Sequence, residues 1–453
     1  MANPTAFSPT AYDISKCLIS TYDRGTTKSF AEIIYCIKIE QSMETSSWYG
    51  EFDVLDNVGL LQDMPLRGEE YIDLELYTYD TKEKVKIKGR VWSISNVVPT
   101  PTMDGVAYKI SFVSETSFAM MQRKITAPFK NSTSNIARDI FSQYISTIRD
   151  YQSRDIDNRS LPLAGRRYPL ISYRQKNFYV QPTGTISDII IPNVSPAKAM
   201  NMVAGRSWSG DETPSQTFRF FETLDGYYFC SDEWLILKEK DNAVELIHSP
   251  VLSLKPSNVE EQIAHIDDLQ IPKRGTDTYS DIESGGYTSK ALEIDFQRRR
   301  VIKKEFNYVK DGKFLDMNGE VRKIRETPHS SQFMNDTFTK ENAKEFIIYK
   351  TYASDGDIAG SLKDEEHMGD IAIARSAYKH HLHNTMVIAS MKGRLDLRPG
   401  KVVQLNLKEF VPDKLKNFNN EVSGRYIIKG TTHKFDKGQL TTQMSLAKFN
   451  WSK

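Results

Sequence analysis

The sequence predicts a mainly β protein with α+β insertions, in which one β module occurs twice. Short runs of alternating apolar and polar residues, separated by turn signals, fill residues 12–120 and recur near the C-terminus, as in small antiparallel barrels. Aromatic residues make up 11% of the chain, which suits β-rich structure. The third observation is that the two β-rich stretches present the same series of turns and strands, which indicates two copies of one module.

The repeat begins near Gly68 in the first copy and near Gly400 in the second. In each copy a leucine and an arginine precede the glycine, and an alternating strand follows it. A comparable set of turns and strands then continues in both copies. The further correspondences are Gly89 with Gly424, the turn Asp104-Gly105 with Lys437-Gly438, and the last strand at 106–112 with that at 440–446.

Composition limits the classes of function. The chain has 453 residues, enough for about three domains. Its 60 basic and 59 acidic residues leave a net charge of +1, which gives no overall field to attract nucleic acid. Three cysteines and the absence of a long apolar run predict a soluble protein made in a reducing cytoplasm, with no signal peptide and no direct membrane insertion.

The pattern changes between the two copies. Apolar residues from Ile136 to Ile148 share one helical face, and Ser132 or Ser134 can cap this helix. A second helix is expected to begin at Ser195-Pro196, because proline at the first helical position is already set for it. An aromatic hairpin with its turn at Asp225-Gly226 follows. This middle region is therefore expected to be α+β.

These patterns predict five segments, with the second β module split by an excursion. They are a flexible arm at 1–11, the first barrel at 12–123, an inserted α+β domain at 124–257, the second barrel at 258–308 and 366–453, and an irregular insertion at 309–365.

Several groups of residues could carry chemistry, and each has a plainer interpretation. The histidines at 380, 381 and 383 could bind a metal, but no further Cys or His is clustered nearby, so a solvated helix end is favoured. Arg298-Arg299-Arg300 could contact phosphate, but a charged exit from an edge strand is the simpler interpretation and is favoured. Asp267-Asp268 and Glu365-Glu366 could act as acid and base, yet such pairs arise by chance among so many carboxylates.

The sequence contains no Walker loop, no GxSxG, no HExxH and no GxGxxG after a strand, and Cys17 lies in a strand pattern. We therefore predict no catalytic, cofactor-binding or metal-binding residues and no enzyme activity.

Four further stretches stand out in their order along the chain: 47–56 (SWYGEFDVLD), 220–229 (FFETLDGYYF), 284–290 (SGGYTSK) and 397–400 (LRPG). In this order they resemble the central baseplate hub protein of contractile-tailed bacteriophages, a family related to the hubs of contractile injection systems. The resemblance spans residues 10–450 except for 309–365, which match nothing in the family.

The resemblance implies two tail-tube-like antiparallel β-barrel domains in one chain with inserted α+β domains. Three subunits would form a ring of six barrels, which matches a trimeric spike on one side and a hexameric tube on the other. Edge strands would pair between neighbouring barrels, and the inner surface would line a channel.

The implied partners are two further copies of the chain as a homotrimer, the central spike protein (which in this family can carry a lysozyme), the tail tube protein whose assembly the ring initiates, the surrounding baseplate wedge proteins, and the tape measure protein and DNA that pass through the lumen. The implied location is the tail baseplate of a virion assembled in the host cytoplasm. Two other functions remain open from the residues: a tail-associated peptidoglycan hydrolase and a carbohydrate-binding β-protein.

Overall fold

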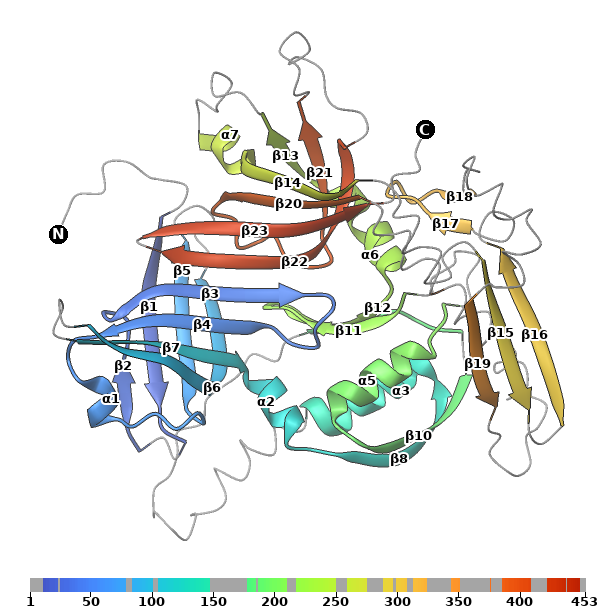
Figure 1. The fold of residues 1–453 in the computed structure, drawn as a ribbon, viewed down its shortest axis with the longest axis horizontal. Helices are drawn as coiled ribbons and strands as arrows, with labels where there is room; N and C mark the ends of the chain where they lie inside the picture. Colours follow the sequence, from blue (N-terminus) through green and yellow to red (C-terminus); the bar gives the residue numbers. More distant parts are fainter. Residues whose placement is uncertain are drawn as a thin grey trace.

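The computed structural model in Figure 1 is built mainly from strands. It describes residues 11–22, 25–78, 84–100, 105–146, 177–184, 186–209, 217–249, 259–274, 288–295, 299–307, 313–323, 344–350, 375, 385–408, 422–436 and 438–448. The strands are β1 (Tyr12–Ser20), β2 (Thr27–Ser29), β3 (Ile34–Ser42), β4 (Tyr49–Asp56), β5 (Tyr71–Thr78), β6 (Lys84–Thr100), β7 (Gly105–Ser114), β8 (Ile125–Ser132), β9 (Asn177–Val180), β10 (Ile186–Val194), β11 (Arg219–Glu222), β12 (Gly226–Cys230), β13 (Val244–His248), β14 (Ile266–Arg274), β15 (Thr288–Asp295), β16 (Arg300–Asn307), β17 (Lys313–Leu315), β18 (Val321–Lys323), β19 (Lys344–Lys350), β20 (Thr385–Lys392), β21 (Val402–Leu407), β22 (Gly424–Asp436) and β23 (Gln439–Lys448). The helices are α1 (Leu60–Asp63), α2 (Glu115–Met121), α3 (Thr133–Ile140), the π-helix η1 (Phe141–Ser146), α5 (Pro196–Gly205), α6 (Asp232–Glu239), the 3₁₀ helix η2 (Lys240–Asn242) and α7 (Val259–Ala264).

Two sets of strands have the same order, both along the chain and across the sheet. We call strands β1–β7 the N-terminal module, and strands β13, β14 and β20–β23 the C-terminal module. Hydrogen-bonded neighbours run β3-β4-β7-β6-β5-β1 in the first and β14-β20-β23-β22-β21-β13 in the second. Each of these six strands therefore has a counterpart, and the module predicted to occur twice does so; the short β2, paired with β1, has no counterpart among the described strands.

The registers of the counterparts agree, including two β-bulges. Bulges are specific features of a strand pairing, so their recurrence supports a duplicated module more strongly than strand order alone. One pair lies between Ile34 and Cys36 in β3 and between Ile266 and Asp268 in β14, and the other between Val91 and Ser93 in β6 and between Ile428 and Gly430 in β22. The outer strands differ, since β1 is antiparallel to β5 whereas β13 is parallel to β21.

One predicted correspondence was displaced by two residues. The sequence matched Gly89 with Gly424, but the structure places Tyr426 at the position of Gly89. Gly89 lies opposite Ile72 in β5, and Tyr426 lies opposite Val403 in the counterpart strand β21. A shift of two residues leaves the inward and outward faces of a strand unchanged, so the apolar pattern cannot detect it.

The two modules join into one sheet through antiparallel pairing of β22 with β3. We call this pairing, residues 430–436 with residues 36–42, the seam. The long strands β6 and β22 pair with different neighbours along their lengths, so they carry the sheet around a bend and give each module a barrel-like shape (Figure 1). The core of the N-terminal module extends across the seam to Phe435 and Leu440 of the C-terminal module.

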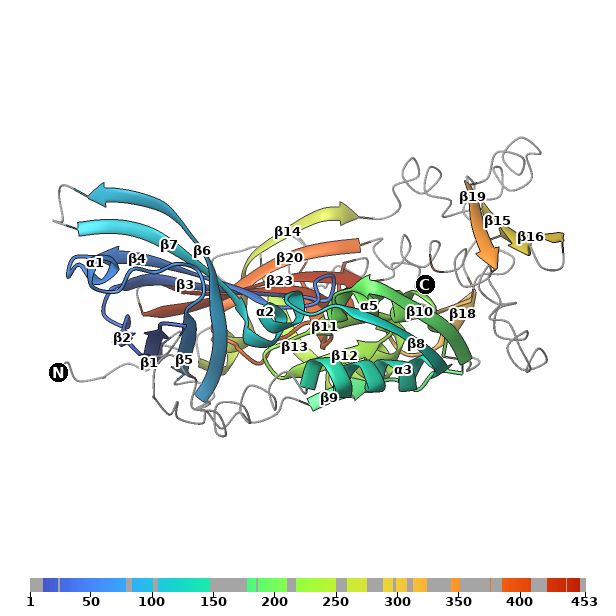
Figure 2. The same cartoon turned by 90° about the horizontal axis from the view of Figure 1, so that it is seen from below.

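The expected α+β region lies between the modules. Its helices α3 and α5 pack against the β8–β10 pair and share one apolar core (Figure 2). Of the two predicted caps, Ser132 is the one used, and its Oγ accepts from the Asn135 N–H at 3.3 Å. α5 begins at Pro196 as expected, and Ser195 Oγ accepts from the Lys198 N–H at 3.4 Å. The predicted hairpin is β11–β12.

Strand membership differs from the predicted division at three places. β13, within the region assigned to the α+β domain, joins the C-terminal module through β21. β15 and β16, assigned to the second barrel, instead form a separate sheet with β19. The described parts of 309–365 contain β17, β18 and β19 rather than irregular chain alone. An alternating pattern identifies a strand but not the sheet that it joins, which explains these differences.

At one equivalent pair of facing positions, the two modules carry different side chains. One module combines a small residue with a large one, and the other combines two of intermediate size. Gly50 lies opposite the buried Phe112, and the counterpart pair is Val387 and Leu446. A Cβ added at Gly50 would lie 2.2 Å from the Phe112 ring. We therefore expect Gly50→Val to lower the free energy of unfolding by about 2 kcal/mol, measured by urea denaturation.

The double variant Gly50→Val/Phe112→Leu reproduces the pair of the C-terminal module and is expected to recover most of that loss. Phe112→Leu without the change at Gly50 leaves a cavity, so this single variant is the matched control and should be destabilising by itself. No recovery in the double variant would contradict the structural equivalence of the two positions.

Candidate functional site

The junction between the two modules is the site where the described polar contacts concentrate. The tip of the β11–β12 hairpin is inserted there. The Leu224 N–H donates to Gln41 Oε1 of β3 at 2.9 Å, and Asp225 forms an ion pair with Arg398 of the C-terminal module. At the base of the tip, Ser114 Oγ of β7 donates to Glu222 Oε1 at 2.8 Å. The hairpin thus contacts both modules and acts as a wedge between them.

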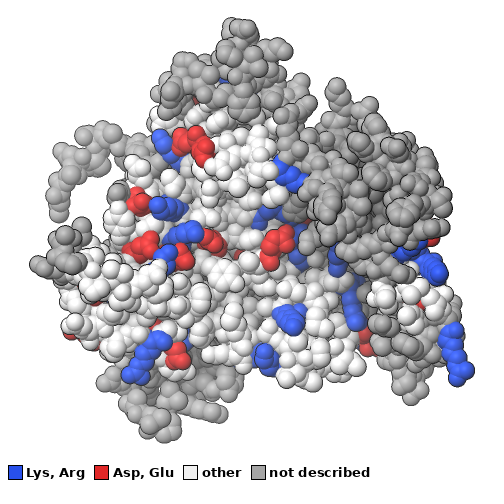
Figure 3. All heavy atoms as spheres, viewed as in Figure 1, with Lys and Arg blue, Asp and Glu red and all other residues white. Residues whose placement is uncertain are grey.

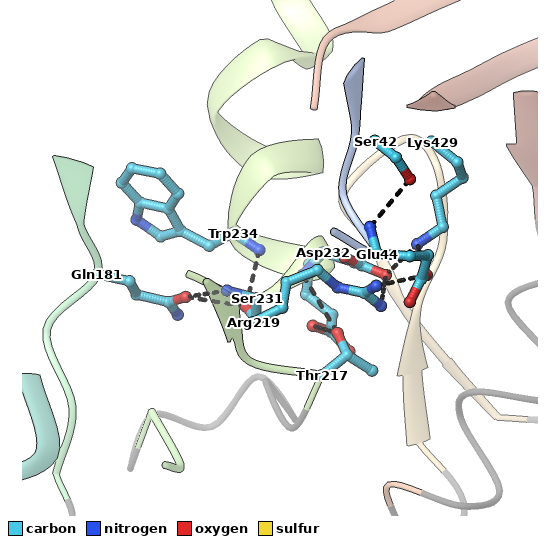
Figure 4. A network of polar contacts seen from close by, with 10 residues as sticks. Ser42, Glu44, Gln181, Thr217, Arg219, Ser231, Asp232, Trp234 and Lys429 are labelled. Atoms are coloured by element: carbon cyan, nitrogen blue, oxygen red, sulfur yellow. Dashed lines mark hydrogen bonds and ion pairs between the residues drawn. The ribbon is translucent and has the colours of Figure 1, made fainter. Parts of the chain in front are cut away.

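A buried ion cluster lies beside this hairpin (Figure 4). Arg219 of β11 contacts Asp232 at 3.0 Å and Glu44 at 2.6 Å. Lys429 of β22 contacts the same Asp232 oxygen at 2.8 Å. Asp232 and Lys429 are almost fully buried, whereas Glu44, in the turn after β3, is half-exposed. Each of the three regions therefore contributes a charge: Glu44 the N-terminal module, Arg219 and Asp232 the insertion, and Lys429 the C-terminal module.

Local structure fixes the central carboxylate. Asp232 is the first residue of α6, where an acidic side chain is favoured by the helix dipole. Ser231 caps the helix, with its Oγ accepting from the Trp234 N–H at 3.2 Å. Gln181 Oε1 accepts from both the N–H and the Oγ of Ser231, at 2.8 and 2.9 Å. The carboxylate is thereby held in place before its cationic partners from other regions reach it.

Lys429 sits at a β-bulge, and this position brings its side chain to the cluster. It is the extra residue between Ile428 and Gly430, where β22 passes from its pairing with β21 to its pairing with β3. Its carbonyl oxygen accepts from the Met43 N–H at 2.9 Å. The residue therefore joins the modules through both its main chain and its side chain.

Burial shifts the pKa values in the cluster. Burial lowers the pKa of Lys429, although Asp232 acts in the opposite direction. Burial acts to raise the pKa of Glu44, but Arg219 and Lys429 outweigh it and hold that pKa low. Burial, with the neighbouring Asp232, raises the pKa of Glu233 to about 7. The carboxylates of Asp232 and Glu44 thus balance the positive charges of Arg219 and Lys429. Glu233 is the carboxyl that takes up a proton near neutral pH.

The candidate residues identified from the sequence lie at different places in the structure and do not form one site among the described residues. Asp267 and Asp268 lie exposed on β14. Arg299 has a φ of 51° in the turn before β16, consistent with a charged strand exit, while Arg298 lies outside the described residues. The histidines at 380, 381 and 383 and the pair Glu365-Glu366 also lie outside them.

The thiols of Cys17 and Cys36 are both buried, and burial raises the pKa of the Cys17 thiol to about 12, which keeps it protonated. Within the described ranges no group of three or more His, Cys, Asp or Glu side chains could hold a metal ion. In the same part of the chain, no helix has the length and apolar character needed to cross a membrane.

Sequence comparisons do not assign the chain. No family model matches it, and no curated protein does. Among solved structures, it is similar to a tail protein from Neisseria meningitidis, with 9% identity, a TM-score of 0.49 and coverage of 97% of this chain and 98% of the other. It is also similar to a tail protein of prophage MuSo2 from Shewanella oneidensis, with 11% identity, a TM-score of 0.47 and coverage of 97% and 100%.

A third similar structure is an E. coli component of the type VI secretion system, with 6% identity, a TM-score of 0.41 and coverage of 97% and 76%. Tail and injection-system proteins therefore occur among the structures that this chain is similar to, in agreement with the resemblance found in the sequence.

The buried cluster predicts a strong dependence of stability on Lys429. Lys429→Met leaves the buried Asp232 with one cationic partner fewer, and we expect a loss of about 3 kcal/mol in the free energy of unfolding. Lys434→Met, in the same strand but at an exposed ion pair, is the control and should change stability by less than about 1 kcal/mol. Equal effects of the two substitutions in urea denaturation would contradict the role of the cluster.

Glu233 predicts a specific pH dependence. Its folded pKa of about 7 lies above the ordinary value of 4.5, so the folded state holds more protons between these values and the free energy of unfolding falls as pH rises through this window. Glu233→Gln imitates the protonated form and should be more stable than the wild type at pH 8 by on the order of 2 kcal/mol, with little difference at pH 4.5. A constant difference between the two proteins across this range, measured by urea denaturation, would exclude the raised pKa.

Proposed function

We propose that this chain is a structural baseplate hub subunit that joins a central spike to a tail tube and initiates tube assembly. Three chains form a ring, so that six modules of one fold face the tube while three identical chains face the spike. The observation that carries the proposal is that two modules with the same strand order and bulges lie side by side in one sheet. A single chain with two near-equivalent modules matches a threefold partner and a sixfold partner at once.

The solvent-facing side of the seam and of the adjacent strands β4 and β7 is suited to line the channel of such a ring. Charges of both signs alternate on it, and Figure 3 shows blue and red side chains interspersed over this part of the surface. The ion pairs include Lys109 with Glu51 at 3.1 Å and Lys434 with Asp436 at 3.2 Å, while Lys38 contacts Glu40. A mixed face of this kind does not attract DNA strongly, so the tape measure protein and DNA can pass along it.

In this proposal the chain has no enzyme activity and resides in the tail baseplate of a virion assembled in the host cytoplasm. Its partners are the spike protein, the tube protein and the surrounding wedge proteins. The proposed divisions of the chain are those of the sequence, with β13 added to the second barrel and β15 and β16 removed from it.

Light scattering coupled to size-exclusion chromatography tests the assembly. We expect a mass of three chains, each of 51.9 kDa, for the chain alone or with its spike partner. A strict monomer in both preparations would contradict the proposal. Clearing of peptidoglycan in a zymogram by the purified chain would favour the hydrolase instead.

A further inference from the structure

The sheet formed by the two modules ends in two open edges. β6 pairs with β5 through residues 84–90, and the Val91 N–H donates to the Glu70 carbonyl at 2.9 Å. No strand among the described residues pairs with the second edge of residues 92–100. At the other end of the sheet, β14 is paired as a strand on one side, with β20, in the described part of the chain (Figure 2). Unpaired strand edges can take another chain by main-chain hydrogen bonding.

Inside the chain, the counterparts of these two edges are joined to each other. β22 is the counterpart of β6, and β3 is the counterpart of β14, as their positions in the two modules show. The seam therefore pairs the second half of a β6-type strand with a β14-type strand. The open edges of β6 and β14 are thus equivalent to the two edges that pair in the seam, but within this chain neither of them has a partner strand among the described residues.

The β6 edge also exposes apolar side chains, whereas the equivalent edge of β22 is buried within the chain. Trp92, Val97 and Val98 are 55%, 52% and 54% exposed. Trp92 is the bulge residue that corresponds to Lys429, which is only 4% exposed because the neighbouring module and α6 cover it. Residues 91–100 contain no charged side chain, so their protection as an edge is limited to Pro99 and to the bulge between Ser95 and Val98.

We propose that residues 93–100 of β6 bind β14 of a second copy of this chain, in the antiparallel register of the seam. Thr432 lies opposite Glu40 in the seam, and the corresponding residues are Ser95 and Lys273. Because the joint connects two different edges, it propagates around a ring instead of ending in a twofold dimer. This inference rests on the proposed function for the number of copies, and it adds the contact that closes the ring.

Disulfide trapping between two differently tagged chains tests the register. One chain carries Ser95→Cys and the other Lys273→Cys, and the two are co-expressed and mildly oxidised. Because each chain has only one introduced thiol, any product that contains both tags joins two copies. We expect this product as the main cross-linked species on a non-reducing gel. The matched control pairs Ser95→Cys with Lys303→Cys on β16 and should give less than one-tenth as much.

The outcomes separate this inference from the proposed function. A trimer by light scattering without the Ser95–Lys273 product would overturn the edge pairing and leave the hub assignment standing. A product formed mainly between two Ser95→Cys chains would overturn it in favour of a twofold β6–β6 contact. A chain that remains monomeric under all conditions would overturn the proposed function, and the edge pairing with it.

A surface variant gives a readout that does not depend on thiols. Trp92→Asp places a charge on the exposed edge and is expected to weaken self-association at least tenfold, while the melting temperature of the separated chain stays unchanged. Ile190→Asp, at a residue of β10 that is 71% exposed, introduces the same charge away from the edge and should leave the trimer intact. Equal self-association of the two variants would overturn the role of Trp92.

Discussion

The antiparallel pairing of β22 with β3 is the contact on which the rest of the structure depends. It joins the sheets of the two modules through main-chain hydrogen bonds between residues 430–436 and 36–42. Main-chain pairing sets the distance between neighbouring strands and the register, and it requires no particular side-chain chemistry. It therefore allows two modules of different sequence to be placed side by side in equivalent positions.

A sheet seam by itself does not prevent the two modules from twisting relative to each other. The inserted α+β region restricts this motion because it contacts both modules. The β11–β12 hairpin contacts β3 and β7 on one side and Arg398 on the other. Next to it, the buried carboxylate of Asp232 is neutralised by Arg219 from the insertion and Lys429 from the C-terminal module. A buried charge without its partner is costly, so the cluster favours the arrangement in which the three regions are assembled. The cluster thus links the three regions at the centre of the structure.

The sequence predicted the strands, the helix caps, the hairpin and the duplication, because each leaves a local pattern. The apolar alternation located the last strands of both copies, and Ser132 and Ser195 identified the helix starts. The two-residue displacement at Gly424 went undetected because strand patterns repeat every two residues. The ion cluster could not be predicted, because Glu44, Asp232 and Lys429 are distant in sequence and nothing in their local context marks them as partners.

Electron cryo-microscopy of the assembled ring, averaged without imposed symmetry, tests the central claim most directly. If the duplicated modules create a sixfold face from three chains, the rotational power spectrum of the sheet layer should contain a strong sixfold component, with threefold order appearing in the layer of the insertions. A sheet layer with threefold order alone, or modules that are not related by a rotation of about sixty degrees about the ring axis, would contradict the account.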